Sequence, residues 1–468
     1  MSRGIVWFRN DLRIRDNEAL YRAVEDFDEV IPIYVIDKGL LDVRDYGSAK
    51  MGTFRMTFIL EALHNLWSRL RELGSDLIVD VGYPADVICR YAKEMEVDAV
   101  YAHKEATKEE LEREKELGQT LGAAKLKFFW GHTLFHINDL PFEYQAVPDV
   151  FTAFRKKCEK YADIRPEFPA PDRISTPDLK TDEIPTLTDL NLTPSGGDRE
   201  TKLFTGGEDA AWDRLNRYFW KTESLSSYKF TRNGLLGMDY SSKFSPWLAA
   251  GCISPRSIYY AVKRYEDNVK KNVSTYWMIF ELIWRDYFRY VALKYGEKLF
   301  YPGGIKGENP NWEDDSELLE KWKSGKTGVP FIDANMRELN TTGFMSNRGR
   351  QNVASFLVKD LNLDWRKGAA YFEEKLVDYD VSSNWGNWAY VAGVGNDPRE
   401  NRYFNIMTQA ARYDGKGEYV KHWFPELSEV DQQHVHAPWT MSSADLSRLG
   451  LVDSAFAHPA VVAKQWKL

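Results

Sequence analysis

Apolar runs and helical patterns alternate regularly through the first 130 residues. Five runs have the length and composition of buried strands: GIVWF, EVIPIYVID, DLIVDVG, AVYAHK and KLKFFWG. Stretches such as TFRMTFILEALHNLWSRLREL lie between them, with apolar residues at three- and four-residue spacing, as on one face of a helix. This alternation predicts a parallel, doubly wound sheet. No G-x-G-x-x-G motif follows the first run, so the usual dinucleotide fingerprint is absent there.

The pattern changes twice further along the chain. From residue 131 to about residue 204 the alternation stops, and RPEFPAPDRISTPDLKTDEIPTLTDLNLTPSGGD has the composition of a linker. From FTGGEDAAWDRLNRYFW onward the pattern is helical nearly to the end. We therefore predict an α/β plus all-α fold, with an α/β domain over residues 1–131, a linker over 132–204, a large helical domain over 205–440 and a short tail over 441–468.

Composition narrows the class of protein. Hydrophobic residues make up 43% and charged residues 28%, an ordinary globular balance, and no stretch approaches the roughly 20 apolar residues of a membrane span. The first residues do not resemble a signal peptide, and the three Cys lie too far apart for a metal-ligand pair or a disulfide framework. We expect a soluble, cytoplasmic protein without a membrane partner. The net charge is −8, but residues 240–412 carry 24 Lys and Arg against 21 Asp and Glu, which permits a local anion-binding face.

Histidine is missing from most of the predicted helical domain. The chain has eight, and none lies between His136 and His422. This gap argues against imidazole-based catalysis there and against a histidine-ligated metal, so we predict no metal site. The segment SGKTG lacks the earlier glycine of a P-loop. Aromatic residues reach 14%, which fits either aromatic-rich cores or a site that stacks on flat molecules.

One predicted helix carries a carboxylate within an aromatic stripe. In STYWMIFELIWRDYFRYVALKY, the residues Trp277, Glu281, Trp284 and Phe288 share one helical face. This face can be a core face on which Glu281 pairs with Arg285, four residues on. It can also be the wall of a pocket, which we favour because a buried carboxylate is costly unless a polar group meets it.

Two further segments combine large rings with small polar residues. In YSSKFSPWLAAGCISPR, three serine hydroxyls precede a helix that we expect to begin near Pro246. The segment is either a phosphate site or a helix start capped by Ser245. In SSNWGNWAYVAG, the rings of Trp385, Trp388 and Tyr390 stand among Gly, Asn and Ser, and core packing alone explains this setting poorly.

Longer strings resemble the photolyase/cryptochrome family: VWFRNDLRIRDN, YSSKFSPWLAAGCISPR, ELIWRDYFR, GKTGVPFIDANMRELNTTGFMSNRGRQNVASFLVKDL, WGNWAYVAGVGNDPR and HAPW. Among them, DYSSKFSPWLA, NRGRQN and GNWAYVAGVGNDPR are similar to the DASH-type cryptochromes. The resemblance implies an α/β antenna domain and a helical domain that holds FAD in a bent form. It also implies that blue light splits cyclobutane pyrimidine dimers, preferentially in single-stranded DNA, by electron transfer from excited reduced FAD.

The resemblance assigns roles to individual positions. Glu281 and Asn347 resemble the pair that holds adenine and the dimer, and Glu281 would stabilise the pyrimidine radical anion by a hydrogen bond. Asn384 matches the residue that faces flavin N5, where repair enzymes carry asparagine. Arg350 would pair with Asp378. The positions expected to bind FAD are Tyr228, Ser241, Ser242, Lys243, Phe244, Ser245, Glu281, Arg285, Asn347, Arg350, Asp378, Asp380 and Asn384.

Four positions would contact the substrate. Trp284 would stack on the flipped-out lesion, and Arg232 would meet a backbone phosphate. Gln351 and Tyr390 stand where duplex-acting enzymes typically have Met and Trp. A polar amide and a smaller ring should stack less well on a dimer. Stacking would then offset less of the free energy needed to flip the dimer out of a duplex. Single strands need no extrusion, and we expect the enzyme to prefer them.

The resemblance also implies a role for Trp388. It matches the flavin-proximal member of a tryptophan electron relay, whose other members would be Trp365 and Trp312. Three ordinary packed tryptophans remain the alternative, because sequence spacing does not give the distance between rings. We interpret Trp385 as packing.

An antenna chromophore and two rival functions complete the expectations. DASH-type proteins usually hold 5,10-methenyltetrahydrofolate between the domains, and Glu109 or Glu110 in KEATKEELEREKEL would contact it, unless this is simply a solvated helix. The histidine gap argues against repair of (6-4) photoproducts. A blue-light receptor that signals through partners is the main rival, although only about 30 residues follow Trp439. A nucleic-acid-binding protein that keeps flavin as part of its fold is the other. We expect a monomer.

Overall fold

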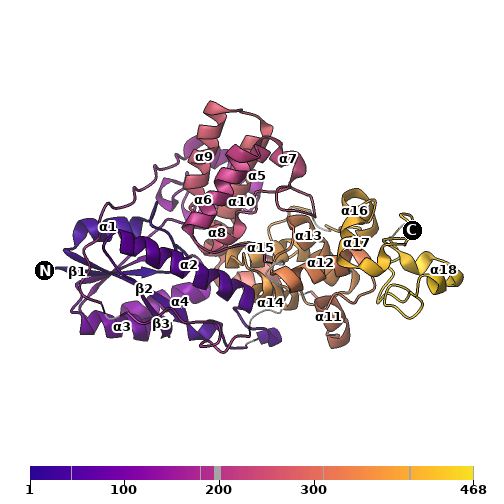
Figure 1. Cartoon of the computed structure of the whole chain (residues 1–468), viewed down its shortest axis with the longest axis horizontal. Coiled ribbons are helices and arrows are strands. Elements are labelled where there is room, and N and C mark those ends of the chain that lie inside the picture. The colour runs from indigo at the N-terminus through magenta and orange to yellow at the C-terminus, as the bar shows by residue number, and fades with distance from the viewer. Residues whose placement is uncertain (44, 180, 194–201, 309, 400–401, 467–468) are drawn as a thin grey trace.

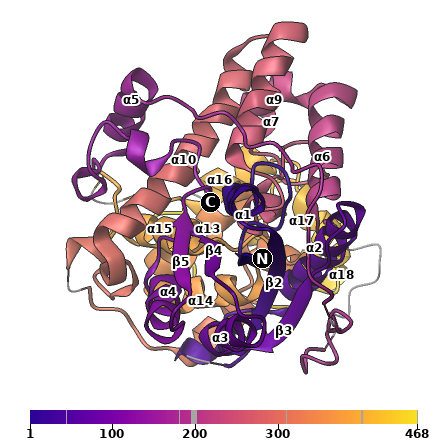
Figure 2. The ribbon, with the colours of Figure 1, turned by 90° about the vertical axis from the view of Figure 1, so that its left-hand side faces the viewer.

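The computed structural model describes residues 1–43, 45–179, 181–193, 202–308, 310–399 and 402–466, and it confirms the predicted α/β plus all-α class (Figure 1). All five predicted strands form one parallel sheet, in the order β3-β2-β1-β4-β5. In Figure 2 the labelled strands run from β5 on the left through β4 and β2 to β3 on the right. The strands are β1 Arg3–Phe8, β2 Glu29–Asp37, β3 Ile78–Gly82, β4 Ala99–His103 and β5 Lys125–Phe129.

The alternation of side chains along β1 explains why both faces of the sheet are covered. Val6 and Phe8 belong to the same buried cluster as residues of α1 (Glu18–Asp26) and α2 (Thr53–Glu72). Ile5 and Trp7 point to the other face and pack with α3 (Pro84–Glu94) and α4 (Lys108–Thr120). A strand that is buried on both faces has apolar residues at successive positions, which is why GIVWF could be predicted as a strand.

The segment predicted as a linker contains a helix. Helix α5 (Phe151–Tyr161) buries Phe151, Phe154 and Cys158, which recur at three- and four-residue spacing. Further on, the chain returns to the sheet domain, where the Ile174 N–H donates to the Leu73 carbonyl at 2.8 Å. The described residues of this segment therefore contact both parts of the molecule, since the Phe154 ring lies 5.4 Å from the Tyr287 ring of the helical part. The predicted boundaries at residues 131, 204 and 440 stay predictions.

The rest of the described chain is built from helices and turns. None of these helices, nor those of the first part, combines the length and the apolar character that a membrane crossing needs. The helices are α6 Glu208–Asn216, α7 Tyr228–Thr231, α8 Ser245–Ala249, α9 Pro255–Asn268, α10 Val273–Tyr295, α11 Ser316–Lys323, α12 Pro330–Thr342, α13 Asn347–Ser355, α14 Trp365–Lys375, α15 Val381–Ala392, α16 Ile406–Tyr413, α17 Glu418–Trp423 and α18 Ser443–Arg448.

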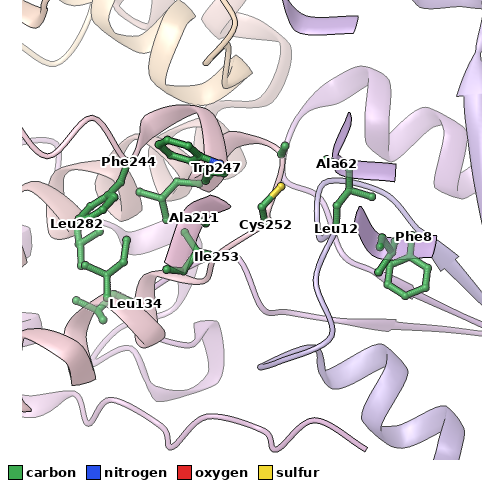
Figure 3. Packing of buried hydrophobic residues seen from close by; sticks show 14 of the residues in the cluster. Phe8, Leu12, Ala62, Leu134, Ala211, Phe244, Trp247, Cys252, Ile253 and Leu282 are labelled. Carbon is green, nitrogen blue, oxygen red and sulfur yellow. The ribbon is translucent and has the colours of Figure 1, made fainter. Parts of the chain in front are cut away.

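The sheet domain and the first helices of the helical part share one hydrophobic core. Leu12, next to β1, lies close to Cys252, and the Trp247 ring belongs to the same cluster (Figure 3). A buried ion pair crosses the same junction: the Arg256 guanidinium donates to the Asp16 carboxylate at 2.6 and 3.0 Å. Because both charges are buried, removing either would leave the other unpaired, which costs several kcal/mol, ~3–5. The two parts are therefore held in one fixed arrangement.

Candidate functional site

A cavity of about 480 Å³ lies among α7, α8, α10, α13 and α15. Its size is within the range of pockets that hold cofactors, roughly 300–1,000 Å³. Its walls contain every residue predicted to bind FAD or the lesion, together with one tryptophan of the predicted relay. These residues are Tyr228, Arg232, Ser241, Ser242, Lys243, Phe244, Ser245, Glu281, Trp284, Arg285, Asn347, Arg350, Gln351, Asp378, Asp380, Asn384, Trp388 and Tyr390.

The serine-rich loop of the cavity is held by a buried arginine that the sequence analysis did not identify. The side chain of Arg214, on α6, donates to an aspartate and to three backbone carbonyls of the loop. Its acceptors are Asp239 at 2.6 Å, Met238 at 3.0 Å, Ser241 at 2.8 Å and Ser242 at 2.9 Å. Charge-assisted bonds to carbonyls are among the strongest in proteins, so this arginine fixes the backbone of the serine-rich loop.

The structure corrects the expected helix cap at Ser245. Ser245 is the first residue of α8, and the cap position belongs to Phe244, whose backbone is already helical. The prediction was wrong because the helix starts one residue earlier than Pro246 suggests. The Ser245 side chain lines the cavity instead. Next to it, Lys243 has a positive φ of 53°, and its ammonium group donates to the Tyr240 hydroxyl at 3.0 Å.

Glu281 projects from α10 into the cavity and pairs with Arg232, at 2.8 Å. The favoured interpretation of this face as a pocket wall is confirmed. The alternative, in which Glu281 pairs with Arg285, is wrong: the Arg285 side chain donates to the backbone carbonyls of His132 and, at 3.1 Å, of Leu248. Tertiary partners have replaced the local i,i+4 pair. Burial raises the pKa of Glu281, and the nearby Arg232 offsets this only in part. This carboxyl can therefore exist in its protonated form closer to neutral pH than an exposed glutamate does.

Trp284 lies next to Glu281 on the cavity wall, and one of its faces is occupied. The Phe151 ring, from α5, stacks on it with a centroid distance of 3.6 Å and an interplanar angle of 9°. On another side Tyr390 stands edge-on at 6.3 Å. The helix that the sequence analysis missed therefore fixes the orientation of a predicted lesion-binding ring.

Four polar side chains line the wall formed by α13, α15 and the chain between α14 and α15. Arg350 donates to both oxygens of Asp378, at 2.8 and 2.9 Å, as expected from the resemblance. Asn384 donates its amide to the backbone carbonyl of Ala369 at 3.0 Å, so this amide is held in one orientation. Asp380 caps α15 by accepting from the Ser383 N–H at 2.8 Å.

Asp380 also begins a buried chain of charges that leads to the sheet domain. It accepts from the guanidinium of Arg289, which also contacts Glu105 at 3.3 Å. Burial alone would raise the pKa of Asp380, but Arg289 and Arg285 outweigh burial and hold it well below its ordinary value. Asp380 is therefore a carboxylate at neutral pH, aimed at the cavity.

Glu105 stands beside two buried imidazoles. The rings of His103 and His132 lie 3.8 Å apart, and His132 contacts Glu105 at 3.3 Å. Within the described residues these three side chains form a group with metal-ligand spacing. Glu105 already accepts from Asn10 at 2.9 Å and from Arg289, so we interpret the group as a hydrogen-bonded junction between the two parts of the molecule.

This junction predicts a pH-dependent stability. Burial holds the pKa of His103 well below its ordinary value, so the imidazole is neutral when folded but protonates in the unfolded chain below about pH 6.5. Its contribution to the free energy of unfolding is present above that pH and is lost at about 1.4 kcal/mol per pH unit as pH falls. Urea denaturation at pH 7 and pH 5 should show that His103→Gln loses less stability on acidification than the unmodified protein. His64→Gln, at an exposed position, should not. Equal losses would contradict the prediction.

The segment SSNWGNWAYVAG forms α15, and its small residues permit close packing. A Cβ on Gly386 would lie 2.4 Å from the Phe288 ring, so glycine lets α15 approach α10. The Trp388 ring lies directly over Gly368 of α14, where a Cβ would be 2.3 Å from it. The helix ends at Gly393, which has a positive φ of 92°. The rings are thus placed by glycines at the points where helices meet.

The tryptophan contacts differ from a simple chain through the three predicted relay members. Trp388 stands edge-on to Trp322 at 6.1 Å, a residue that the sequence analysis did not single out. Trp365 instead contacts Trp385, at 5.7 Å, and donates its indole N–H to the Pro302 carbonyl at 3.0 Å. Trp312 is half-buried at the edge of the same core. The relay stays a prediction.

A cluster of arginines lies beside the cavity. Arg232 and Arg402 line it, and the Arg348 guanidinium, which feels the charges of both, lies over the Tyr413 ring. Burial lowers the pKa of Arg348, and the neighbouring charges of Arg232, Arg412 and Arg402 lower it further. Arg232 pairs with Glu281 and Arg402 with Asp397, and Arg348 adds a further guanidinium, so this group of side chains suits an anion.

The two glutamates predicted to contact an antenna lie on α4, facing the helical part. Glu109 pairs with Lys50, and Glu110 accepts from the Thr107 hydroxyl. Burial raises the pKa of Glu110. Both side chains have partners within the protein, so their contact with a chromophore stays a prediction.

The cavity fits FAD. Ser241, Ser242 and Ser245 offer hydroxyls, and the adjoining wall is apolar, with Phe344, Phe372 and Leu248 among its members. Asp378 and Asp380 are fixed by arginines, and the Gln351 side-chain oxygen is buried without a hydrogen-bond partner among the described residues. Hydroxyls suit a diphosphate, apolar walls suit an isoalloxazine, and orphaned acceptors call for ligand donors.

Comparison with known proteins identifies the class that this fold and cavity define. Residues 4–172 match the family described as DNA photolyase, and residues 277–467 match the FAD binding domain of DNA photolyase. Two solved photolyases have the same fold, each at 29% sequence identity. The class III enzyme from Agrobacterium tumefaciens has a TM-score of 0.84 and covers 100% of this chain and 94% of its own. The archaeal enzyme from Sulfolobus tokodaii has a TM-score of 0.79 and covers 97% of this chain and 100% of its own. The chain belongs to the photolyase/cryptochrome family.

The more similar relatives lie in the DASH branch of this family. The protein named cryptochrome DASH from Gloeobacter violaceus is 48% identical over 99% of this chain and 96% of its own length. The cryptochrome DASH from Xenopus laevis is 47% identical over 99% of this chain and 90% of its own length. The crystal structure of a Synechocystis cryptochrome has a TM-score of 0.93 at 48% identity, covering 96% of this chain and 94% of that one.

Proposed function

We propose that this protein uses blue light to repair cyclobutane pyrimidine dimers, preferentially in single-stranded DNA. The observation that carries the proposal is one cavity whose walls bring together Glu281, Trp284, Asp380 and Asn384, with Arg232 and Arg402. Bound reduced FAD would supply the photoexcited electron. The chain would act as a monomer in the cytoplasm.

The residues of the cavity would divide the work of binding and positioning. Arg350 and Asp378 would fix the cofactor, while the constrained amide of Asn384 would face the flavin ring without releasing a proton. Glu281, with its raised pKa, would donate a hydrogen bond to the dimer. Arg232, which now pairs with Glu281, would turn to a DNA phosphate when the lesion enters.

Photorepair of defined oligonucleotides tests this function. The reduced protein would be irradiated with an oligonucleotide that carries one thymine dimer, single-stranded or in a duplex, at matched salt. We expect thymines to be restored faster in the single strand. Failure to restore thymines in either substrate would contradict repair and favour a light receptor that signals through partners.

We expect the preference for single-stranded over duplex DNA to depend on Gln351 and Tyr390. In the double variant Gln351→Met, Tyr390→Trp, a larger apolar surface should stack better on a flipped dimer and offset the few kcal/mol of extrusion. We expect duplex repair to rise roughly tenfold relative to single-strand repair. Val391→Ile, at an apolar cavity position, should leave the ratio unchanged. An unchanged ratio in the double variant would show that other residues set the preference.

We propose 5,10-methenyltetrahydrofolate as the antenna, bound near Glu109 and Glu110. The Sulfolobus tokodaii photolyase was solved with two FAD molecules, so a second flavin is the alternative. The pigment released by denaturing the purified protein distinguishes the two: a pterin supports folate, and two FAD per chain support a flavin.

A further inference from the structure

A short stretch of chain, residues 402–405, borders the cavity with every second side chain. Arg402 and Phe404 line the cavity, whereas Tyr403 and Asn405 are not among its lining residues. The stretch belongs to no helix or strand. Because no regular backbone ladder fixes it, its position depends on contacts with other segments of the chain.

Residues 465 and 466 hold the two side chains of this stretch that do not line the cavity. The Trp466 indole N–H donates to the Tyr403 hydroxyl at 2.8 Å. The Asn405 side-chain amide donates to the Gln465 backbone carbonyl, also at 2.8 Å. Two positions about 60 residues along the chain thus grip residues 402–405, and we call Gln465 and Trp466 the tail brace.

The tail brace is itself fixed to the core of the helical part. Trp466 is buried, its ring stacks on Phe356 with a centroid distance of 6.2 Å, and it lies 6.3 Å from the Trp439 ring. The Tyr403 hydroxyl that accepts from Trp466 donates in turn to Asp360, at 2.9 Å. Phe356 and Asp360 begin and end the turn that follows α13. The border of the cavity is therefore tied to the core through these contacts.

On its cavity side, the same stretch contacts a residue predicted to meet the lesion. The Arg402 guanidinium lies 4.9 Å from the centroid of the Tyr390 ring and donates to its hydroxyl at 3.3 Å. Tyr390 stands edge-on to Trp284, which is also predicted to contact the lesion. Binding groups have to be held within about 0.5 Å of their productive geometry. A shift of residues 402–405 would therefore disturb the part of the cavity where the dimer is expected.

We propose that Gln465 and Trp466 position Arg402 and Phe404 at the cavity, and that lesion affinity depends on this brace. The inference rests on the proposed function and deepens it, because it names residues outside the cavity on which substrate binding depends. Neither Gln465 nor Trp466 lines the cavity, so they are positioning residues that act through residues 402–405. We expect the brace to act on lesion affinity, with the FAD content and the quantum yield of a bound dimer unchanged.

Binding and repair of a single-stranded oligonucleotide with one thymine dimer test the brace in the reduced holoprotein. Trp466→Ala should weaken binding roughly tenfold, since residues in one hydrogen-bond network are energetically coupled. Tyr403→Phe keeps the ring but removes the hydroxyl between Trp466 and Asp360, and should weaken binding about two- to tenfold. The matched control is Phe456→Ala, which removes another buried ring of the tail that packs on Phe424 at 5.0 Å. It should lose stability in urea but keep its affinity for the oligonucleotide.

A double variant shows whether the brace acts through Arg402. In the Arg402→Ala background, Trp466→Ala should weaken binding little further, whereas a full additional loss would overturn the proposal. An equal loss of affinity in Phe456→Ala would also overturn it, because the effect would then be one of general stability. If Trp466→Ala does not fold, Tyr403→Phe decides, and unchanged affinity in that variant contradicts the brace.

The same measurements separate this inference from the proposed function. If the unmodified protein repairs the single strand but Trp466→Ala and Tyr403→Phe bind it equally well, the brace is wrong and repair stands. If the unmodified protein neither binds nor repairs the oligonucleotide, both proposals fail together.

Discussion

Replacing Glu281 with Ala should lower the repair of a single-stranded dimer by roughly ten- to a hundredfold. A hydrogen bond that forms to a charged species contributes ~1.5–3 kcal/mol, and this one would strengthen as negative charge develops on the pyrimidine. The variant also removes the partner of Arg232, which leaves the arginine free for phosphate. We therefore expect affinity for DNA to be unchanged or higher while the yield of repaired dimer per absorbed photon falls.

The quantum yield of repair measures this effect, with the visible spectrum as a check that the cofactor is still bound. Glu281→Gln, which keeps a donor, should retain more activity than Glu281→Ala. Glu317→Ala, on the exposed surface of α11, is the control for loss of a carboxylate. Full repair by Glu281→Ala would remove this carboxyl from the mechanism and favour a protein that binds nucleic acid without repairing it.

Replacing Trp388 with Phe should slow photoreduction of the oxidised protein at least tenfold and leave repair by chemically reduced protein intact. Trp388 is the indole on the cavity wall next to Asn384, and phenylalanine is much harder to oxidise. The ring fits over Gly368 in either case, so the packing of α14 against α15 should survive. Bleaching of the oxidised cofactor band under blue light with an external reductant follows the reaction.

Trp385→Phe and Trp322→Phe are informative companions to this experiment. Trp322 contacts Trp388, and its other ring contacts among the described residues are with Tyr371 and Phe372, so no further indole continues a route through it. We expect Trp322→Phe and Trp385→Phe to photoreduce nearly as fast as the unmodified protein. Slow photoreduction in Trp385→Phe alone would contradict the relay through Trp388 and direct attention to the pair of Trp365 and Trp385.

The fold could be predicted where one residue type dominates a whole element. The runs GIVWF and EVIPIYVID are apolar because their strands are buried on both faces, and that signal is local. Helix α5 was missed because the Pro, Asp and Thr residues that follow it dominate the composition of residues 132–204. The signal was nevertheless present, since Phe151, Phe154 and Cys158 lie on one helical face.

The site was predictable in its membership and in one contact, that of Arg350 with Asp378, but its other contacts were not predicted. Similar strings in the family indicated which residues meet, and the cavity contains them. Contacts that depend on tertiary placement escaped sequence reasoning: Glu281 pairs across to Arg232, because α7 brings that arginine closer than Arg285. Arg214 and Arg289 were also missed, since an arginine in a charged helix carries no sign of being buried.

The apolar cluster that joins Leu12 to Trp247 and Cys252 determines how the protein can be divided experimentally. Dividing the chain near residue 131 or residue 204 would leave each fragment with an exposed apolar surface that the other fragment normally covers. Either fragment made by itself should precipitate, and the two should become soluble together only when co-expressed. For this molecule the practical unit for engineering, tagging or transplantation is the undivided chain.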